Sequence, residues 1–301
     1  MKRLGWQLIE KKMDLTTAQW LSVLAFQSAG FVAMDFLAHP FNTLWTVQQT
    51  TDNGKLLSFR KAFQQIKRTN GLKGFYAGFT VQAVSSAPGA WSYLKGRELS
   101  LLIFGDNSAG QLMQGPLGVC CGSLLWSPAI TLMISEQSGY NSMVKNDFNH
   151  LSLTKKAQYI WKNSGVRGFY RGTLPLVFSF SISDAFGSWA QAKILQHYPT
   201  DERKKLIPQL FSTALAFNMS AILTSPAEII FARLKLAEGN RVVFQEKTAR
   251  DAIKTIYSTR GVRGFFNALP TYMLHNTVWH KILPFKTMVD EISSIGGLTR
   301  N

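Results

Sequence analysis

The chain contains the string Asn70-Gly-Leu-Lys-Gly-Phe-Tyr-Ala-Gly78 and repeats it as Ser164-Gly-Val-Arg-Gly-Phe-Tyr-Arg-Gly172 and Arg260-Gly-Val-Arg-Gly-Phe-Phe-Asn-Ala268. The first glycines of the strings are 94 (165 − 71) and 96 (261 − 165) residues apart. A second landmark precedes each string, as His39-Pro40, Ser127-Pro128 and Ser225-Pro226. Two landmarks that recur in the same order at nearly one spacing indicate a threefold internal repeat.

The composition excludes two classes of protein and narrows the others. Of 301 residues, 46% are apolar and 17% charged, which gives ample surface to bury and excludes a disordered chain. The two cysteines are adjacent, at Cys120 and Cys121, which excludes a disulfide scaffold. The net charge of +16 is typical of a nucleic-acid-binding protein or of a membrane protein with basic loops.

The positions of the charges favour a membrane. Six stretches are nearly uncharged and about as long as the 20 or so residues that cross a bilayer as a helix. They are Leu15–Val47, Phe75–Phe104, Asn107–Ser135, Leu174–Leu195, Leu206–Ala227 and Asn267–Phe285. The basic connectors Lys55–Lys73, Lys155–Arg171 and Arg241–Arg263 alternate with these stretches, whereas nucleic-acid binding requires one basic face. We therefore expect no nucleic-acid partner.

Each repeat predicts the same series of elements. A membrane helix is bent or ended by the landmark proline near its far end. A short amphipathic basic helix follows, such as Ser58–Thr69 with Phe59, Phe63 and Ile66 at helical spacing. A glycine-rich turn then leads into a second membrane helix.

These strings and prolines resemble those of the mitochondrial carrier family from about Leu15 to Asp290. The resemblance implies an all-α membrane protein with six transmembrane helices in three pseudo-symmetric αα repeats, joined by short amphipathic helices on the matrix side. The expected segments are an amphipathic N-terminal segment 1–14, repeats 15–104, 105–198 and 199–291, and a tail 292–301. The resemblance also implies a multi-pass protein of the mitochondrial inner membrane.

The glycine-rich turns resemble the family's sites for the cardiolipin head group. Backbone N–H groups and the positive end of a helix attract phosphate at such turns. The expected residues are Gly71, Tyr76, Ala77 and Gly78 in the first turn, Gly165, Tyr170, Arg171 and Gly172 in the second, and Gly261, Phe266, Asn267 and Ala268 in the third. Ala268 departs from the pattern, so the third site should be weaker; the alternative is that the glycines only permit a tight turn. Structural cardiolipin is the one bound group expected.

The family closes its matrix side with ion pairs, and most of these charges are missing here. In the family an acid lies two residues after each proline and a base three residues later. The acid positions hold Asn42, Ile130 and Glu228, and the base positions hold Trp45, Met133 and Phe231. One of the six charges remains, so we expect a hydrophobic plug that does not cycle easily; the alternative is gating by weaker contacts.

Substrate contacts in the family lie midway along the even-numbered helices. The matching positions are Ser85, Ser179, Phe180, His275 and Asn276, and Asp35 and Asp184 are further candidates because carboxylates are costly within a membrane. The alternative for the two aspartates is pairing with Lys281 or His280, or capping of backbone groups. Without a cluster of three basic residues, a nucleotide is not expected, and a small neutral or cationic solute is.

No catalytic or metal-binding motif is present, so the sequence does not predict an enzyme. The missing gate charges favour a carrier-like protein that has lost transport and is an accessory or scaffold subunit of an inner-membrane complex, with protein partners of the respiratory-chain type. The alternative is an active carrier that moves its solute by alternating access.

Overall fold

The computed structural model describes residues 17–49, 57–105, 107–137, 151–203, 205–239 and 246–281. The described residues are almost entirely helical and contain no strand. The predicted N-terminal segment 1–14 and tail 292–301 lie outside the described residues.

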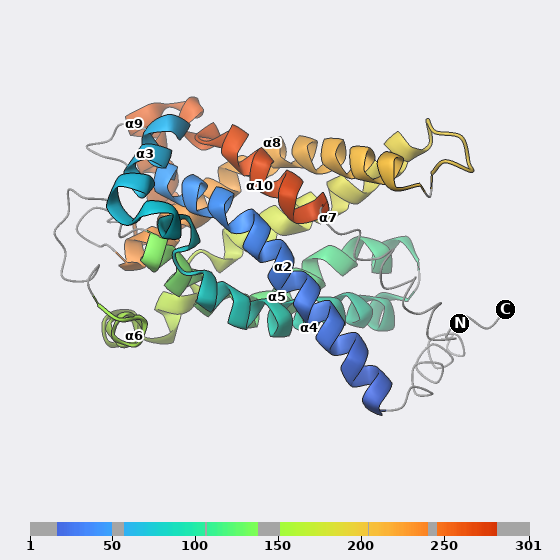
Figure 1. The fold of residues 1–301 in the computed structure, drawn as a ribbon, viewed down its shortest axis with the longest axis horizontal. Coiled ribbons are helices and arrows are strands. Elements are labelled where there is room, and N and C mark those ends of the chain that lie inside the picture. The colour runs from blue at the N-terminus through green and yellow to red at the C-terminus, as the bar shows by residue number, and fades with distance from the viewer. Residues whose placement is uncertain are drawn as a thin grey trace.

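The helices follow one another in the order that the repeats predict. The elements are α2 (Thr17–Gln49), α3 (Phe59–Asn70), η1 (Gly71–Tyr76), α4 (Phe79–Phe104), α5 (Ser108–Gln137), α6 (Leu153–Tyr170), α7 (Thr173–Leu195), α8 (Leu206–Gly239), α9 (Ala249–Arg260), η4 (Val262–Phe266) and α10 (Leu269–Lys281). The short helices α3, α6 and α9 gather at one end of the molecule, called here the short-helix end (Figure 1). The long helices extend from it toward the opposite end, in agreement with the all-α fold predicted.

The landmark prolines do not end their helices, which corrects one of the two readings of these residues. Pro40, Pro128 and Pro226 lie inside α2, α5 and α8, which continue to Gln49, Gln137 and Gly239. Proline removes a single backbone donor and leaves the following turns able to form. Those turns are held by burial, since residues 43–49, for example, are all buried.

Helix α3 forms where its predicted amphipathic pattern lies. Ser58 precedes it in an extended conformation and accepts a hydrogen bond from the Lys61 backbone N–H at 3.4 Å. Ala62 and Ile66 are buried against α2, whereas Phe59 and Phe63 are partly exposed. Phe63 packs on Phe75 of η1, with ring centroids 4.9 Å apart.

The last residue of each repeated string adopts a left-handed conformation. Gly78 and Gly172 have φ of 75° and 80° directly before α4 and α7, and Ala268 has φ of 59° directly before α10. Gly78 also faces Met133 so closely that an added Cβ would lie 3.0 Å from the Met133 Cα. The turn therefore requires glycine at this position for both conformation and space.

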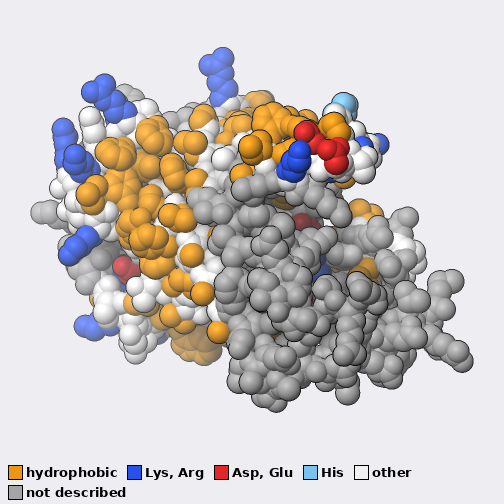
Figure 2. Space-filling model, turned by 45° about the vertical axis from the view of Figure 1, so that its right-hand side comes forward, with side chains coloured by type: hydrophobic (Ala, Val, Ile, Leu, Met, Phe, Trp, Pro, Cys, Tyr) orange, Lys and Arg blue, Asp and Glu red, His pale blue; other side chains and the backbone are white. Residues whose placement is uncertain are grey.

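Apolar side chains cover the outer face of the long helices. Leu102, Leu112 and Ile207 are 61%, 65% and 79% exposed. Figure 2 shows such side chains over much of the described face, with Lys and Arg mostly around its edges. Within the described residues, Leu112–Gln137 and Ile207–Ala237 have the length and composition of membrane spans. An outer surface of this kind suits contact with lipid tails.

Candidate functional site

The long helices enclose a cavity of about 140 Å³. Its walls come from α2, α4, α5, α7, α8 and α10. The lining residues are Phe31, Asp35, Ala38, His39, Asn42, Trp45, Gln82, Ser86, Trp126, Ile130, Met133, Ile134, Leu176, Phe180, Glu228, Phe231, Tyr272, His275 and Asn276. Two of them are carboxylates and none is Lys or Arg. The cavity therefore carries an acidic and aromatic lining.

The carboxylate of Asp35 is oriented by two side chains of α4. Ser86 donates its hydroxyl hydrogen bond to Asp35 Oδ2, and Gln82 Nε2 donates to the same oxygen at 3.3 Å. Asp35 is 7% exposed. Because a buried carboxylate needs hydrogen-bond donors, these contacts fix its direction toward the cavity.

The carboxylate of Glu228 lies across the cavity on α8. Ser179 of α7 donates a hydrogen bond of 2.5 Å to Glu228 Oε1, and Tyr272 of α10 also faces this carboxylate. Ser179 and Tyr272 are both neutral side chains. In their ionised form, the carboxylates of Asp35 and Glu228 would attract a cation to the cavity.

Two histidines contribute to the lining. His39 lies inside α2, 1% exposed, with Nε2 2.8 Å from the Ala77 carbonyl oxygen. His275 of α10 lies beside Asn276 on the lining. Among the described residues, no group of three His, Cys, Asp or Glu side chains is arranged to hold a metal ion.

All six positions of the family's matrix gate lie on this cavity. Asn42 Nδ2 donates to the Met133 sulfur at 3.8 Å, so an acid position and a base position of neighbouring repeats still meet, but through a weak hydrogen bond. Trp45, Met133 and Phe231 are buried, and the Trp45 ring packs on Tyr272 with centroids 5.9 Å apart. The cavity is therefore closed at this level by apolar packing.

The basic residues after Glu228 pair elsewhere. Arg233 forms a buried ion pair of 2.6 Å with Glu246. Lys235, fully buried, donates to Ser127 Oγ and Thr131 Oγ1 at 2.7 Å and to the Phe169 carbonyl at 2.7 Å. Neither residue replaces the missing gate charges on the cavity wall.

The sequence-predicted cavity residues separate into two groups. Asp35, Phe180, His275 and Asn276 are lining residues, whereas Ser85, Ser179 and Asp184 are not. In α4 the lining side chains are Gln82 and Ser86, which both donate to Asp35, whereas the described hydrogen bond of Ser85 goes to the Gln82 carbonyl of its own helix. Ser179 is fully buried and contacts the lining through the hydrogen bond that its hydroxyl donates to Glu228.

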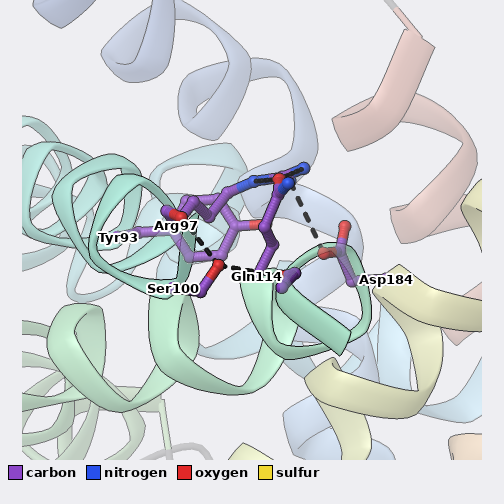
Figure 3. A network of polar contacts seen from close by, with 6 residues as sticks. Tyr93, Arg97, Ser100, Gln114 and Asp184 are labelled. Atoms are coloured by element: carbon purple, nitrogen blue, oxygen red, sulfur yellow. Dashed lines mark hydrogen bonds and ion pairs between the residues drawn. The ribbon is translucent and has the colours of Figure 1, made fainter. Parts of the chain in front are cut away.

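Asp184 takes part in a network that sequence reasoning missed (Figure 3). Its partner is Arg97 of α4, with Nη1 3.5 Å from Asp184 Oδ2. Arg97 also donates to Tyr93 and Gln114. The four-residue step from Tyr93 to Arg97 places both on one helix face, which is the signal that was available in the sequence.

The glycine-rich turns keep their backbone geometry at the short-helix end. Gly71, Gly165 and Gly261 share φ values of 59–62°. The Tyr170 hydroxyl donates to the Leu124 carbonyl at 2.8 Å, which fixes the second turn to α5. Their predicted lipid contacts stay a prediction.

Helical repeats around a largely apolar cavity that carries two carboxylates, with an apolar outer face, are typical of a carrier-type membrane protein. The family model described as "Mitochondrial carrier protein" matches residues 17–108 and 202–283, more than half of the chain. The chain belongs to the mitochondrial carrier family.

Three relatives align with most of the chain. It is 23% identical to "Mitochondrial substrate carrier family protein E" of Dictyostelium discoideum over 83% of this chain and 88% of the relative. It is also 23% identical to "Mitoferrin" of the same organism, over 90% and 95%. The identity is 24% to the "Mitochondrial S-adenosylmethionine carrier protein" of Xenopus laevis, over 81% and 86%.

Proposed function

We propose that the protein is a multi-pass carrier of the mitochondrial inner membrane that moves a small organic cation by alternating access. The observation that carries the proposal is the charge of the cavity. Asp35 and Glu228 line it from α2 and α8, and none of the lining residues in the described part of the chain is Lys or Arg. Among the described lining residues, a carboxylate anion or nucleotide would meet no Lys or Arg side chain.

The aromatic lining suits the same class of solute. Phe31, Trp126 and Phe180 line the cavity together with the two carboxylates. Aromatic faces attract organic cations through their quadrupole, by about 0.5–2 kcal/mol for each contact. The cavity therefore offers both charge compensation and a desolvated surface to an ammonium, guanidinium or sulfonium group.

The apolar floor is compatible with transport. Opening Trp45, Met133 and Phe231 to water breaks packing and the weak Asn42–Met133 hydrogen bond, but no buried ion pair at the gate positions. Alternating access requires two states of similar free energy and a solute that binds them differently. A cation that offsets the desolvation of Asp35 and Glu228 supplies such a difference.

The relatives favour transport over the accessory-subunit reading. Two of the three named above are called carriers, and S-adenosylmethionine, which gives one its name, is a sulfonium cation. No observation on the described residues favours assembly into a respiratory complex. The expected cardiolipin at the three turns is kept in the proposal as a structural lipid.

Uptake by proteoliposomes tests the proposal. The purified protein should take up radiolabelled S-adenosylmethionine, agmatine or choline and should leave malate and ADP outside. Uptake of malate or ADP in preference to every cation would overturn cation selectivity. Uptake of none, together with stoichiometric co-migration in a large inner-membrane complex, would restore the accessory-subunit reading.

A further inference from the structure

Arg97 of α4 contacts side chains of α5 and α7 and so connects three helices, on the side of the cavity away from the short-helix end. Its Nε and Nη2 donate to Gln114 Oε1 of α5 at 3.3 and 3.0 Å, and its Nη1 donates to the Tyr93 hydroxyl at 3.0 Å. The same Nη1 lies 3.5 Å from Asp184 Oδ2 of α7. Figure 3 shows Arg97 and Asp184 directed toward each other across α5. The network thus places a cation and an anion side by side.

This pair continues the walls of the cavity. Asp184 lies one helical turn beyond Phe180, and Arg97 lies one turn beyond Tyr93 on its helix, so each shares a face with that residue. Phe180 lines the cavity, and Tyr93 packs on the lining residue Trp126 with ring centroids 6.0 Å apart. The pair therefore forms the next layer of the wall, on the side away from the short-helix end.

Two glycines of α5 make room for the pair. A Cβ added at Gly115 would lie 2.9 Å from Asp184 Oδ2. A Cβ added at Gly118 would lie 2.9 Å from both Arg97 Cγ and Tyr93 Cε2. Because both side chains lie directly on the α5 backbone, their charged ends are held in one place.

Arg97 and Asp184 are exposed enough, and bonded to each other weakly enough, to form hydrogen bonds with a ligand. The side chains of Arg97 and Asp184 are 35% and 21% exposed, and their 3.5 Å separation is long for a charge-assisted hydrogen bond. A guanidinium has five N–H donors, and the contacts above use four. A solute that supplies both a carboxylate and an ammonium would satisfy each residue better than they satisfy each other.

We propose that Arg97 and Asp184 form an outer subsite that binds the carboxylate and ammonium of an α-amino acid head, while the cationic tail of the same solute lies in the cavity. The inference rests on the proposed function and names its solute class. Arg97 pairs with the carboxylate, and Asp184 accepts from the ammonium.

The spacing fits such a solute. Asp184 lies five residues from Ser179, the partner of Glu228, which is a rise of about 7.5 Å along a helix. The side chains of lysine and arginine place their charge about five bonds from Cα, or roughly 6 Å when extended. The cavity of about 140 Å³ is also smaller than the 300–1,000 Å³ or so of whole ligand sites, as expected if it takes the tail alone.

Matched solutes in proteoliposomes test the subsite. L-Arginine, L-lysine and S-adenosylmethionine are compared with agmatine, cadaverine and decarboxylated S-adenosylmethionine, which lack only the carboxylate. Wild-type protein should take up at least one amino acid about ten times faster than its decarboxylated partner. Arg97→Gln should bring this ratio close to one, and Arg97→Lys should restore part of it. Lys95→Gln removes an exposed charge of the same helix outside the network and should leave the ratio unchanged.

Three outcomes would overturn the inference. A ratio near one in the wild type excludes an amino acid head. Equal slowing of both solutes by Arg97→Gln, at an unchanged ratio, assigns the pair to holding α4 and α7 together. Uptake of neither these six solutes nor choline removes the proposed function and the subsite with it, whereas uptake of the amines or choline without the amino acids removes only the subsite. If Arg97→Gln does not fold, the melting temperature of the wild type is measured with each solute. A larger increase with L-arginine than with agmatine supports the amino acid head, and equal increases overturn it.

Discussion

Lys235 of α8 donates a 2.7 Å hydrogen bond to the main-chain carbonyl of Phe169, in the turn of the preceding repeat. Lys235, Gln49 and Gln137 each lie nine residues after a landmark proline, and all three are fully buried. Gln137 donates to Thr43 at 3.2 Å, and Gln49 donates to the Asn267 carbonyl at 3.3 Å. Each repeat is therefore tied to another by the same position, which closes a ring of contacts at the short-helix end.

This ring predicts a specific order of stability. Lys235→Met removes a charged donor from several buried oxygens and should cost about 1–3 kcal/mol of unfolding free energy. Lys235→Gln supplies the residue of the other two repeats and should cost less. Thermal unfolding in one detergent measures both variants. A Lys235→Met protein as stable as the wild type would contradict the role of this contact.

The turn before α4 predicts that alanine substitutions at its two glycines, Gly71 and Gly78, destabilise the protein by different amounts. Gly71→Ala meets no atom within 4 Å, so the loss of stability comes from its backbone conformation, with φ of 62° and ψ of −151°, and should be about 1–3 kcal/mol. Gly78→Ala adds a close approach to the Met133 backbone and should cost clearly more. The denaturation midpoints of the two variants measure this difference in stability. Equal midpoints would show that the close contact between Gly78 and Met133 of α5 does not contribute to stability.

The apolar floor predicts a leak when it is emptied. Trp45→Ala combined with Phe231→Ala removes two buried rings from the closed level of the cavity. Proteoliposomes containing this variant should lose an imposed proton gradient faster than those with wild-type protein. Trp161→Ala, at a 61% exposed position on α6, is the control and should not leak. An unchanged gradient in the double variant would place the seal elsewhere.

The capping box of α9 predicts a contribution at acid pH. The Thr248 side chain and backbone hydrogen bonds hold the pKa of Asp251 below its usual value of 3.8. A lowered pKa in the folded state means that the stabilisation is present above this value and is lost as the pH falls through the folded pKa. The melting temperature of wild type should therefore fall more between pH 5 and 3, roughly the range of this titration, than that of Asp251→Asn. If the melting temperatures of the two proteins fell equally with pH, the capping box would not contribute to stability in this way.

The repeats made the fold predictable, because the glycine strings and prolines mark the same turns three times. The pattern does not show whether a helix stops at Pro40 or continues, since packing of the turns beyond it decides this. The six predicted gate positions all lie on the cavity, and their role as a gate stays a prediction.

The polar partners were not predictable from the repeat. Arg97 and Asp184 are separated by 87 residues and break the threefold pattern, so spacing gives no reason to pair them. Ser86 and not Ser85 lines the cavity because of how α4 is rotated about its axis. Counting residues from the glycine-rich turn is not accurate enough to distinguish two adjacent positions. Both features follow from how the helices pack rather than from a motif.

The central claim is that the two cavity carboxylates select a cation, and one measurement tests it most directly. Initial uptake of a cation shown to be transported is measured for Asp35→Asn, for Glu228→Gln and for Ser100→Ala, whose buried hydroxyl hydrogen-bonds to backbone carbonyls beside the outer network. The account predicts a loss of at least about tenfold, or 1.4 kcal/mol, in each carboxylate variant and little change in the control. Uptake at the wild-type rate in both carboxylate variants, with normal folding, would contradict it.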